Sequence, residues 1–99
     1  MTNDDTNQLD DELDSALEGN LPALLMQQPN ESALQFAAFL AYLRLGVHRS
    51  IRQVAAEGGH DERHTQRWSS RFEWGRRAAY FDALKARAQL RDMLQEVAA

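Results

Sequence analysis

The chain has 99 residues, of which 43% are hydrophobic and 26% charged, as is ordinary for one small globular domain with tails. It contains no cysteine, which excludes disulfides and thiolate metal sites. The net charge of −4 conceals an asymmetry: residues 1–43 carry eight acidic and no basic residues, whereas residues 44–99 carry eleven basic and seven acidic residues. This pattern is typical of a nucleic-acid contact beside an acidic tail, or of a tail that only aids solubility.

Residues 1–29 are predicted to form a flexible acidic tail and a linker. After Met1, only four apolar residues, Leu9, Leu13, Ala16 and Leu17, interrupt the polar composition of residues 2–19. Repulsion among the neighbouring carboxylates opposes compaction, so we expect only transient helix near residues 10–18. One short helical turn is expected after Pro22, up to Met26.

Residues 30–79 are predicted to form a helix-turn-helix domain, which makes the fold all-α. Its first helix begins at Asn30 or Ser32, and Ser32 with Gln35 has the spacing of a capping box. Apolar residues recur at helical spacing around much of this helix, so it is expected to be largely buried. Gly46 is expected to end it.

The next two helices form the predicted helix-turn-helix unit. Ser50 caps a short helix that runs to about Glu57, and Gly59 provides the positive φ that the tight turn requires. Asp61 then caps a third helix that runs to about residue 70. Thr65 and Trp68 are expected to face inward, with Trp68 closing the core.

A longer fourth helix is predicted from residue 74 to about residue 97, and residues 80–99 form its C-terminal extension. Residues at spacings of three and four make a heptad-like seam along it: Ala83, Ala86, Leu90, Met93 and Val97. Two interpretations stay open. The seam associates with copies of itself, giving a homo-oligomer, or the helix folds back on the first helix of its own chain.

The exposed face of the third helix is predicted to read DNA through Arg63, Gln66 and Arg67. Arginine pairs bidentately with guanine, and glutamine with adenine, in the major groove. Five further arginines are predicted to bind phosphates around it: Arg49, Arg52, Arg71, Arg76 and Arg77. The acidic Asp61 and Glu62 oppose this reading unless Asp61 turns inward as a cap. A small helical bundle with a solvated arginine face, or one that meets an acidic protein partner, is the alternative. We also hypothesise that the acidic tail competes with DNA for the arginine-rich face.

No motif for catalysis, metal binding or cofactor binding is recognised, so the protein is predicted not to be an enzyme. Gly58-Gly59 lacks the rest of a phosphate-binding loop, and His60 and His64 are expected to be exposed turn residues. The longest apolar run, residues 36–43, is too short to span a bilayer. The acidic N-terminus also lacks the features of a secretion signal, so a cytoplasmic location is expected.

Three segments together resemble a known family. They read R-S-I-R-Q-V-A at residues 49–55, W-S-S-R-F-E-W at 68–74 and R-A-A-Y-F-D at 77–82. The chain is similar over residues 31–82 to the N-terminal domain of phage small terminase subunits, and W-S-S-R-x-x-W is the most specific part of the match. The resemblance implies recognition of double-stranded viral DNA for packaging, in the cytoplasm of a bacterial host. It also implies a ring-forming homo-oligomer and a large terminase subunit with ATPase and nuclease activity as partner. A transcription regulator that uses the same motif on an operator is the alternative.

Overall fold

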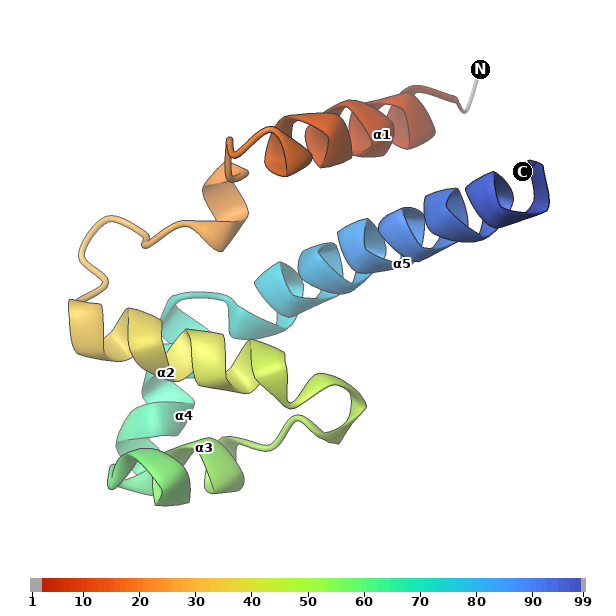
Figure 1. The fold of residues 1–99 in the computed structure, drawn as a ribbon. Coiled ribbons are helices and arrows are strands. Elements are labelled where there is room, and N and C mark those ends of the chain that lie inside the picture. The colour runs from red at the N-terminus through yellow and green to blue at the C-terminus, as the bar shows by residue number, and fades with distance from the viewer. Residues whose placement is uncertain (1–2, 99) are drawn as a thin grey trace. The chain divides into compact units, whose positions relative to one another are not determined.

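The computed structural model describes residues 3–98, and the side chains of residues 8–98. These residues form five α-helices and two short 3-10 helices, with no strand among them (Figure 1). The predicted all-α fold with a longer C-terminal helix is therefore confirmed. The chain divides into two compact units. One is Gln27–Ala78, and the other joins the described residues up to Met26 with those from Ala79 onward.

The unit Gln27–Ala78 contains the three helices predicted for the helix-turn-helix domain, followed by the start of a longer one. They are α2 (Ala33–Arg44), α3 (Ile51–Gly58), α4 (Glu62–Arg71) and the first residues of α5 (Trp74–Ala98). Figure 1 shows α2 lying across the pair formed by α3 and α4. Their bounds agree closely with those predicted from the sequence.

Local signals determine where α2 begins and ends. The Ser32 hydroxyl accepts a hydrogen bond from the Gln35 amide at 3.1 Å, and the Gln35 side chain accepts one from the Ser32 amide at 2.8 Å. This is the predicted capping box, and it satisfies two donors at the helix start. The helix ends at Arg44, and Gly46, with φ of 58°, begins the 3-10 turn Gly46–His48.

Aromatic rings form the centre of this unit. Phe39 of α2 and Trp74 of α5 are both 0% exposed, and their ring centroids lie 6.0 Å apart. The Tyr42 ring lies 5.3 Å from Trp74, and Val54 and Ala55 bury the inner face of α3. Burial of this large apolar surface supplies most of the stabilisation expected for so small a unit.

The prediction that Trp68 closes the core is wrong. Trp68 is only half-buried, and its ring meets His60 edge-on at 5.1 Å. The buried residue of α4 is Thr65, which is 0% exposed and whose hydroxyl donates to the Asp61 carbonyl at 2.9 Å. Trp68 follows Thr65 by three residues and is therefore rotated about 60° around the helix, to the edge of the buried face. Trp74 fills the core instead.

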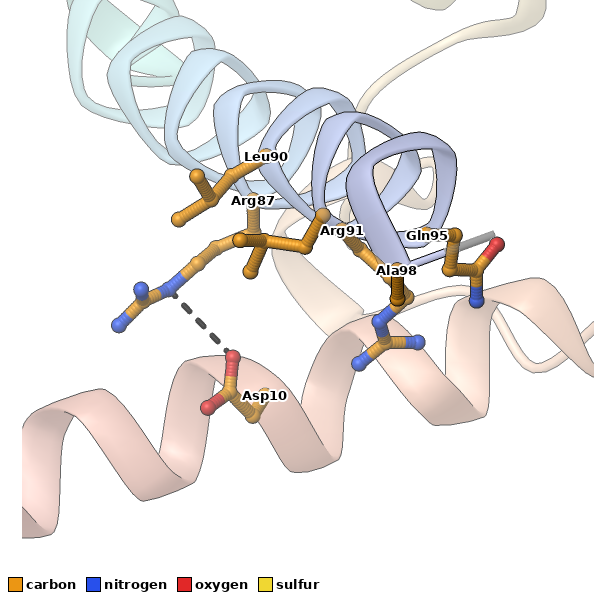
Figure 2. A pocket seen from close by; sticks show the side chains of 7 residues that line it. Asp10, Arg87, Leu90, Arg91, Gln95 and Ala98 are labelled. Atoms are coloured by element: carbon orange, nitrogen blue, oxygen red, sulfur yellow. Dashed lines mark ion pairs between the residues drawn. The ribbon is translucent and has the colours of Figure 1, made fainter.

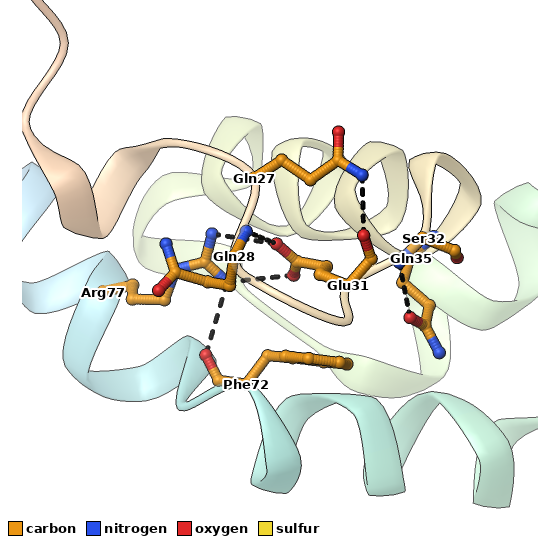
Figure 3. Close-up of polar contacts among 7 residues, drawn as sticks. All are labelled: Gln27, Gln28, Glu31, Ser32, Gln35, Phe72 and Arg77. Atoms are coloured by element: carbon orange, nitrogen blue, oxygen red, sulfur yellow. Dashed lines mark hydrogen bonds and ion pairs between the residues drawn. The ribbon is translucent and has the colours of Figure 1, made fainter.

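A buried ion pair joins the segment before α2 to α5 (Figure 3). The Arg77 guanidinium reaches both carboxylate oxygens of Glu31, at 3.0 and 3.3 Å, and the two side chains are 1% and 0% exposed. Arg77 also donates to the Phe72 carbonyl at 3.3 Å and lies 3.7 Å from the centroid of the Phe39 ring. The Gln28 amide donates to the same carboxylate at 2.9 Å. The pair is thus bidentate and has further hydrogen-bond partners, as a buried pair requires.

Arg77 therefore does not belong to the phosphate-binding arginines in which the sequence placed it. It follows Trp74 by three residues on α5, and Ala78, which is also buried, follows Trp74 by four. Residues at these spacings share one helical face. This face is turned into the core, so the Arg77 charge is unavailable to a phosphate.

The second unit pairs α1 (Asn3–Leu17) with the part of α5 from Ala79 onward, and includes the 3-10 turn Ala23–Leu25. Figure 1 shows the two helices running in opposite directions, and two ion pairs join them, Asp10 with Arg87 and Asp14 with Arg91. Leu13 of α1 and Leu84 of α5 are buried.

This unit differs from the flexible tail that the sequence predicted. Residues 3–17 form a helix, whereas residues 1 and 2 of the predicted tail lie outside the described residues. The physical reason is that α1 carboxylates have cationic partners on α5, which offset the repulsion expected within the isolated segment. The short turn expected after Pro22 is present at Ala23–Leu25.

Candidate nucleic-acid interface

Helices α3 and α4 are joined by the short turn of residues 59–61. Ser50 caps α3, its hydroxyl accepting from the Gln53 amide at 3.2 Å. Gly59 has the predicted positive φ, at 69°, which a side chain disfavours, and the next amide, that of His60, donates back to the Ala55 carbonyl at 2.8 Å. The backbone thus leaves α3 and enters α4 within one tight turn, which is the spacing of a helix-turn-helix unit.

Asp61 is committed to the start of α4. One carboxylate oxygen accepts from the Arg63 amide at 2.8 Å and from the His64 amide at 3.2 Å. An acidic cap at this position satisfies two unpaired amides and complements the positive end of the helix dipole. In the sequence, the negative charge of Asp61 opposed DNA binding unless this residue served as a helix cap. The structure gives it that capping role. Glu62 remains exposed beside it.

The outer face of α4 carries three exposed polar side chains, Arg63, Gln66 and Arg67. Successive helical residues are rotated by about 100°, so these three fall within an arc of about 100°. Thr65, which is buried, lies on the opposite side of the helix. None of the three makes a side-chain hydrogen bond or ion pair with another described residue. Their donors and acceptors are therefore available to an external partner.

Three of the predicted phosphate-binding arginines are also exposed. Arg52 lies on α3, and Arg71 ends α4 with its guanidinium carbon 5.2 Å from the centroid of the Phe72 ring. Arg76, near the start of α5, lies 3.4 Å from Glu73 in an ion pair that is largely exposed. Exposed pairs of this kind are weak and exchange readily, so Arg76 can turn to another anion.

Arg49 is placed differently. It is half-buried, and its guanidinium donates to the carbonyls of Tyr42 and Leu43, both at 3.1 Å. These carbonyls belong to the last turn of α2, where intrahelical partners are missing. Arg49 therefore caps α2 and positions the loop before α3. The sequence had predicted that Arg49 binds a phosphate instead.

The turn also contains a packing feature that the sequence did not reveal. The prediction that His60 is exposed is wrong, because its ring is half-buried against Trp68. The ring also lies so close to Gly58 that a Cβ atom there would approach it to 2.6 Å. Gly58 therefore makes room for His60, while Gly59 provides the turn. His64 is exposed, as predicted. Within residues 8–98, no group of three or more His, Cys, Asp or Glu side chains is placed to hold a metal ion.

None of the helices in the described part of the chain is long and apolar enough to cross a membrane. Comparisons with protein-family models, with curated proteins and with solved structures found no match. Function must therefore be inferred from the helices and their side chains.

Proposed function

We propose that the protein binds double-stranded DNA without catalysing a reaction, and that α4 enters the major groove. The observation that carries this proposal is the exposed set Arg63, Gln66 and Arg67, which shares one face of a helix that directly follows a tight turn. A helix fits the major groove of B-DNA, where arginine recognises guanine and glutamine recognises adenine.

The exposed arginines around α4 provide the contacts that do not depend on DNA sequence. Arg52, Arg71 and Arg76 come from the three helices of this unit that follow α2. Guanidinium groups bind phosphate in a forked geometry, and such contacts set orientation and affinity.

The biological role that we propose is that of a small terminase subunit, which recognises viral DNA and hands it to a large subunit with ATPase and nuclease activity. The resemblance of residues 31–82, with W-S-S-R-x-x-W as its most specific part, supports this role. The second candidate is a transcription regulator, which would use the same helices on an operator. Copurification with a packaging ATPase from infected cells would favour the first role, and its absence alongside binding to a promoter would favour the second.

A homo-oligomer belongs to the same proposal. The last turns of α5 expose large apolar side chains, including three of the predicted seam: Leu90, Met93 and Val97, with Leu94 beside them. Contiguous exposed apolar residues often mark an association surface. Leu90→Glu would place a charge there, so light scattering should show a shift toward monomer. A parent protein that is already monomeric at high concentration would contradict the oligomer.

DNA binding is tested with a duplex selected from a random pool, using fluorescence anisotropy over a range of salt concentrations. Arg63→Ala, Gln66→Ala and Arg67→Ala should each weaken binding to that duplex by about 1–3 kcal/mol if the side chain reads a base. Arg52→Ala should weaken binding to all duplexes alike. It should also flatten the salt slope, which is the slope of the logarithm of the binding constant against the logarithm of the salt concentration, by about one unit.

Lys85→Ala is the control for the loss of one positive charge, because Lys85 is exposed on α5 and lies outside α4. It should leave sequence preference unchanged. If Arg63→Ala and Arg67→Ala both bind the selected duplex as the parent does, α4 is not the recognition helix.

A further inference from the structure

Carboxylates of α1 lie against cationic and hydroxyl groups of α5, and Figure 2 shows one of these contacts, between Asp10 and Arg87. Asp10 approaches the Arg87 guanidinium at 3.4 Å, and Asp14 accepts a hydrogen bond from Arg91 at 2.7 Å. The hydroxyl of Tyr80, on α5, donates to the carboxylate of Glu12, on α1. Arg87 and Arg91 are four residues apart and so share one face of α5, and Figure 2 shows both side chains extending toward α1.

The charge on α1 has a single sign. Residues 3–18 contain seven acidic and no basic residues, so α1 presents carboxylates without any compensating cation of its own. Carboxylate and phosphate oxygens accept from guanidinium groups in the same forked geometry. Asp10 and Asp14 therefore occupy positions on Arg87 and Arg91 that phosphate oxygens of DNA can take.

These contacts are suited to exchange. The side chains of Arg87 and Asp10 are 28% and 45% exposed, and those of Arg91 and Asp14 are 35% and 57% exposed. Partly exposed ion pairs are worth little and are screened by salt. Burial of the Tyr80 hydroxyl, together with the hydrogen bond to Glu12 and its charge, raises the pKa of Tyr80. A tyrosine hydroxyl is protonated at neutral pH even without this shift, so Tyr80 can donate to either kind of anion.

We propose that Arg87, Arg91 and Tyr80 form a second phosphate-binding surface, which α1 occupies in the free protein and which DNA phosphates take over on binding. This inference rests on the proposed DNA binding but adds a site outside α4. It also revises the hypothesis about the acidic segment. The arginines with which its carboxylates pair lie on α5 and belong to none of those predicted to contact DNA.

The test compares two double variants of the full chain that lose the same charge. Asp10→Asn with Asp14→Asn removes both carboxylates from the arginines. Asp11→Asn with Glu18→Gln removes two exposed carboxylates, neither of which pairs with a cation in the described part of the chain. Circular dichroism checks that both variants keep the helical content of the parent.

The first double variant should bind DNA several-fold more tightly than the second. Adding Arg87→Gln and Arg91→Gln should abolish this gain. An equal gain in the two double variants would overturn the inference, since α1 would then act through net charge alone. No gain in the first variant would overturn it equally.

The Arg63→Ala and Arg67→Ala double variant separates this inference from the proposed role of α4. If it leaves DNA binding intact while the Arg87 and Arg91 substitutions abolish the gain, α4 is not the recognition helix but the second surface stands. If it weakens binding and neutralising Asp10 and Asp14 changes nothing, α4 stands and the second surface fails. DNA binding by none of the proteins overturns both.

Displacement of α1 has a direct readout in amide hydrogen exchange. Saturating DNA should accelerate exchange in residues 8–17 of the parent protein, because the carboxylates lose their partners and the helix loses its support. Retention of full protection across these residues in the DNA complex would overturn the exchange of α1 for phosphate.

Discussion

The two compact units each hold an arginine against a carboxylate, in surroundings that differ. In Gln27–Ala78, Arg77 and Glu31 are 3.0 Å apart and 1% and 0% exposed. In the other unit, Arg91 and Asp14 are closer, at 2.7 Å, but 35% and 57% exposed. Distance alone would rank the second pair as the stronger. Burial reverses this ranking. Removing one partner costs more free energy in the buried pair, because the charge left alone in the core cannot be hydrated.

The same contrast extends to the rest of each unit. The core of the helix-turn-helix unit contains three fully buried residues, Phe39, Thr65 and Trp74, so the stability of this unit depends on packing. In the unit of α1 and α5, Leu13 and Leu84 are the buried apolar residues among those described, and the ion pairs face water. The first unit is therefore held by its packed core, whereas the second is held partly by exposed ion pairs, as the proposed displacement of α1 requires.

Arg77→Met should produce the largest effect, a loss of about 3–5 kcal/mol of unfolding free energy, because it leaves the Glu31 carboxylate buried without its cation. Urea denaturation followed by circular dichroism measures the loss. Arg76→Met is the matched control on the neighbouring residue, since its pair with Glu73 is exposed, and it should cost less than about 1 kcal/mol. Equal losses for the two variants would show that burial does not distinguish the pairs.

Trp74→Ala should destabilise the helix-turn-helix unit by about 3–5 kcal/mol, the usual range for an aromatic residue removed from a packed core. Trp68→Ala removes the same side chain from a half-buried position and should cost clearly less. Denaturation midpoints of the two variants give the comparison. If Trp68→Ala proves the more damaging, the core is closed by α4, as the sequence had suggested.

Two glycines in this unit should respond in opposite directions. Gly59 and Gly75 both have no atom within 4 Å of an added Cβ, but Gly59 has a φ of 69° and Gly75 is helical. Gly59→Ala should therefore destabilise by about 1–2 kcal/mol through backbone strain alone. Gly75→Ala should stabilise by up to about 1 kcal/mol through helix propensity. Thermal melts of the two variants test the sign, and a Gly59→Ala protein as stable as the parent would contradict the strain.

The features that the sequence predicted are those with a short-range cause. Ser32 and Gln35 are three residues apart, Gly59 must turn the chain locally, and Asp61 caps the helix that follows it. The exposed positions of Arg63, Gln66 and Arg67 followed from helical spacing once the bounds of α4 were known. Each of these predictions needs only the neighbouring turn of the chain.

The features that it missed depend on residues distant in the chain. Arg77 meets Glu31 across 46 positions, and Arg91 meets Asp14 across 77. No periodicity reports such pairs, so Arg77 appeared to be a surface cation and α1 a flexible tail. Arg49 was missed for a related reason, because its acceptors are carbonyls, which are present at every residue and carry no sequence signal.

The smallest expected effect is a response to salt that separates the two units. Raising the salt from about 0.05 to about 1 M shortens the screening length to about 3 Å and weakens the exposed pairs of α1 by less than about 1 kcal/mol in total. Amide hydrogen exchange should then accelerate in residues 8–17, while α2, α3 and α4 keep their protection because packing is not screened. Asp14→Asn at low salt should reproduce part of this loss of protection, and Asp11→Asn, which breaks no pair, should not.

If protection in α1 and in α2–α4 falls together, the ion pairs of α1 do not hold this helix independently of the helix-turn-helix unit. If α1 becomes better protected at high salt, apolar contacts and not ion pairs support this helix. A polyanion such as DNA could then not displace α1 by competing for the arginines.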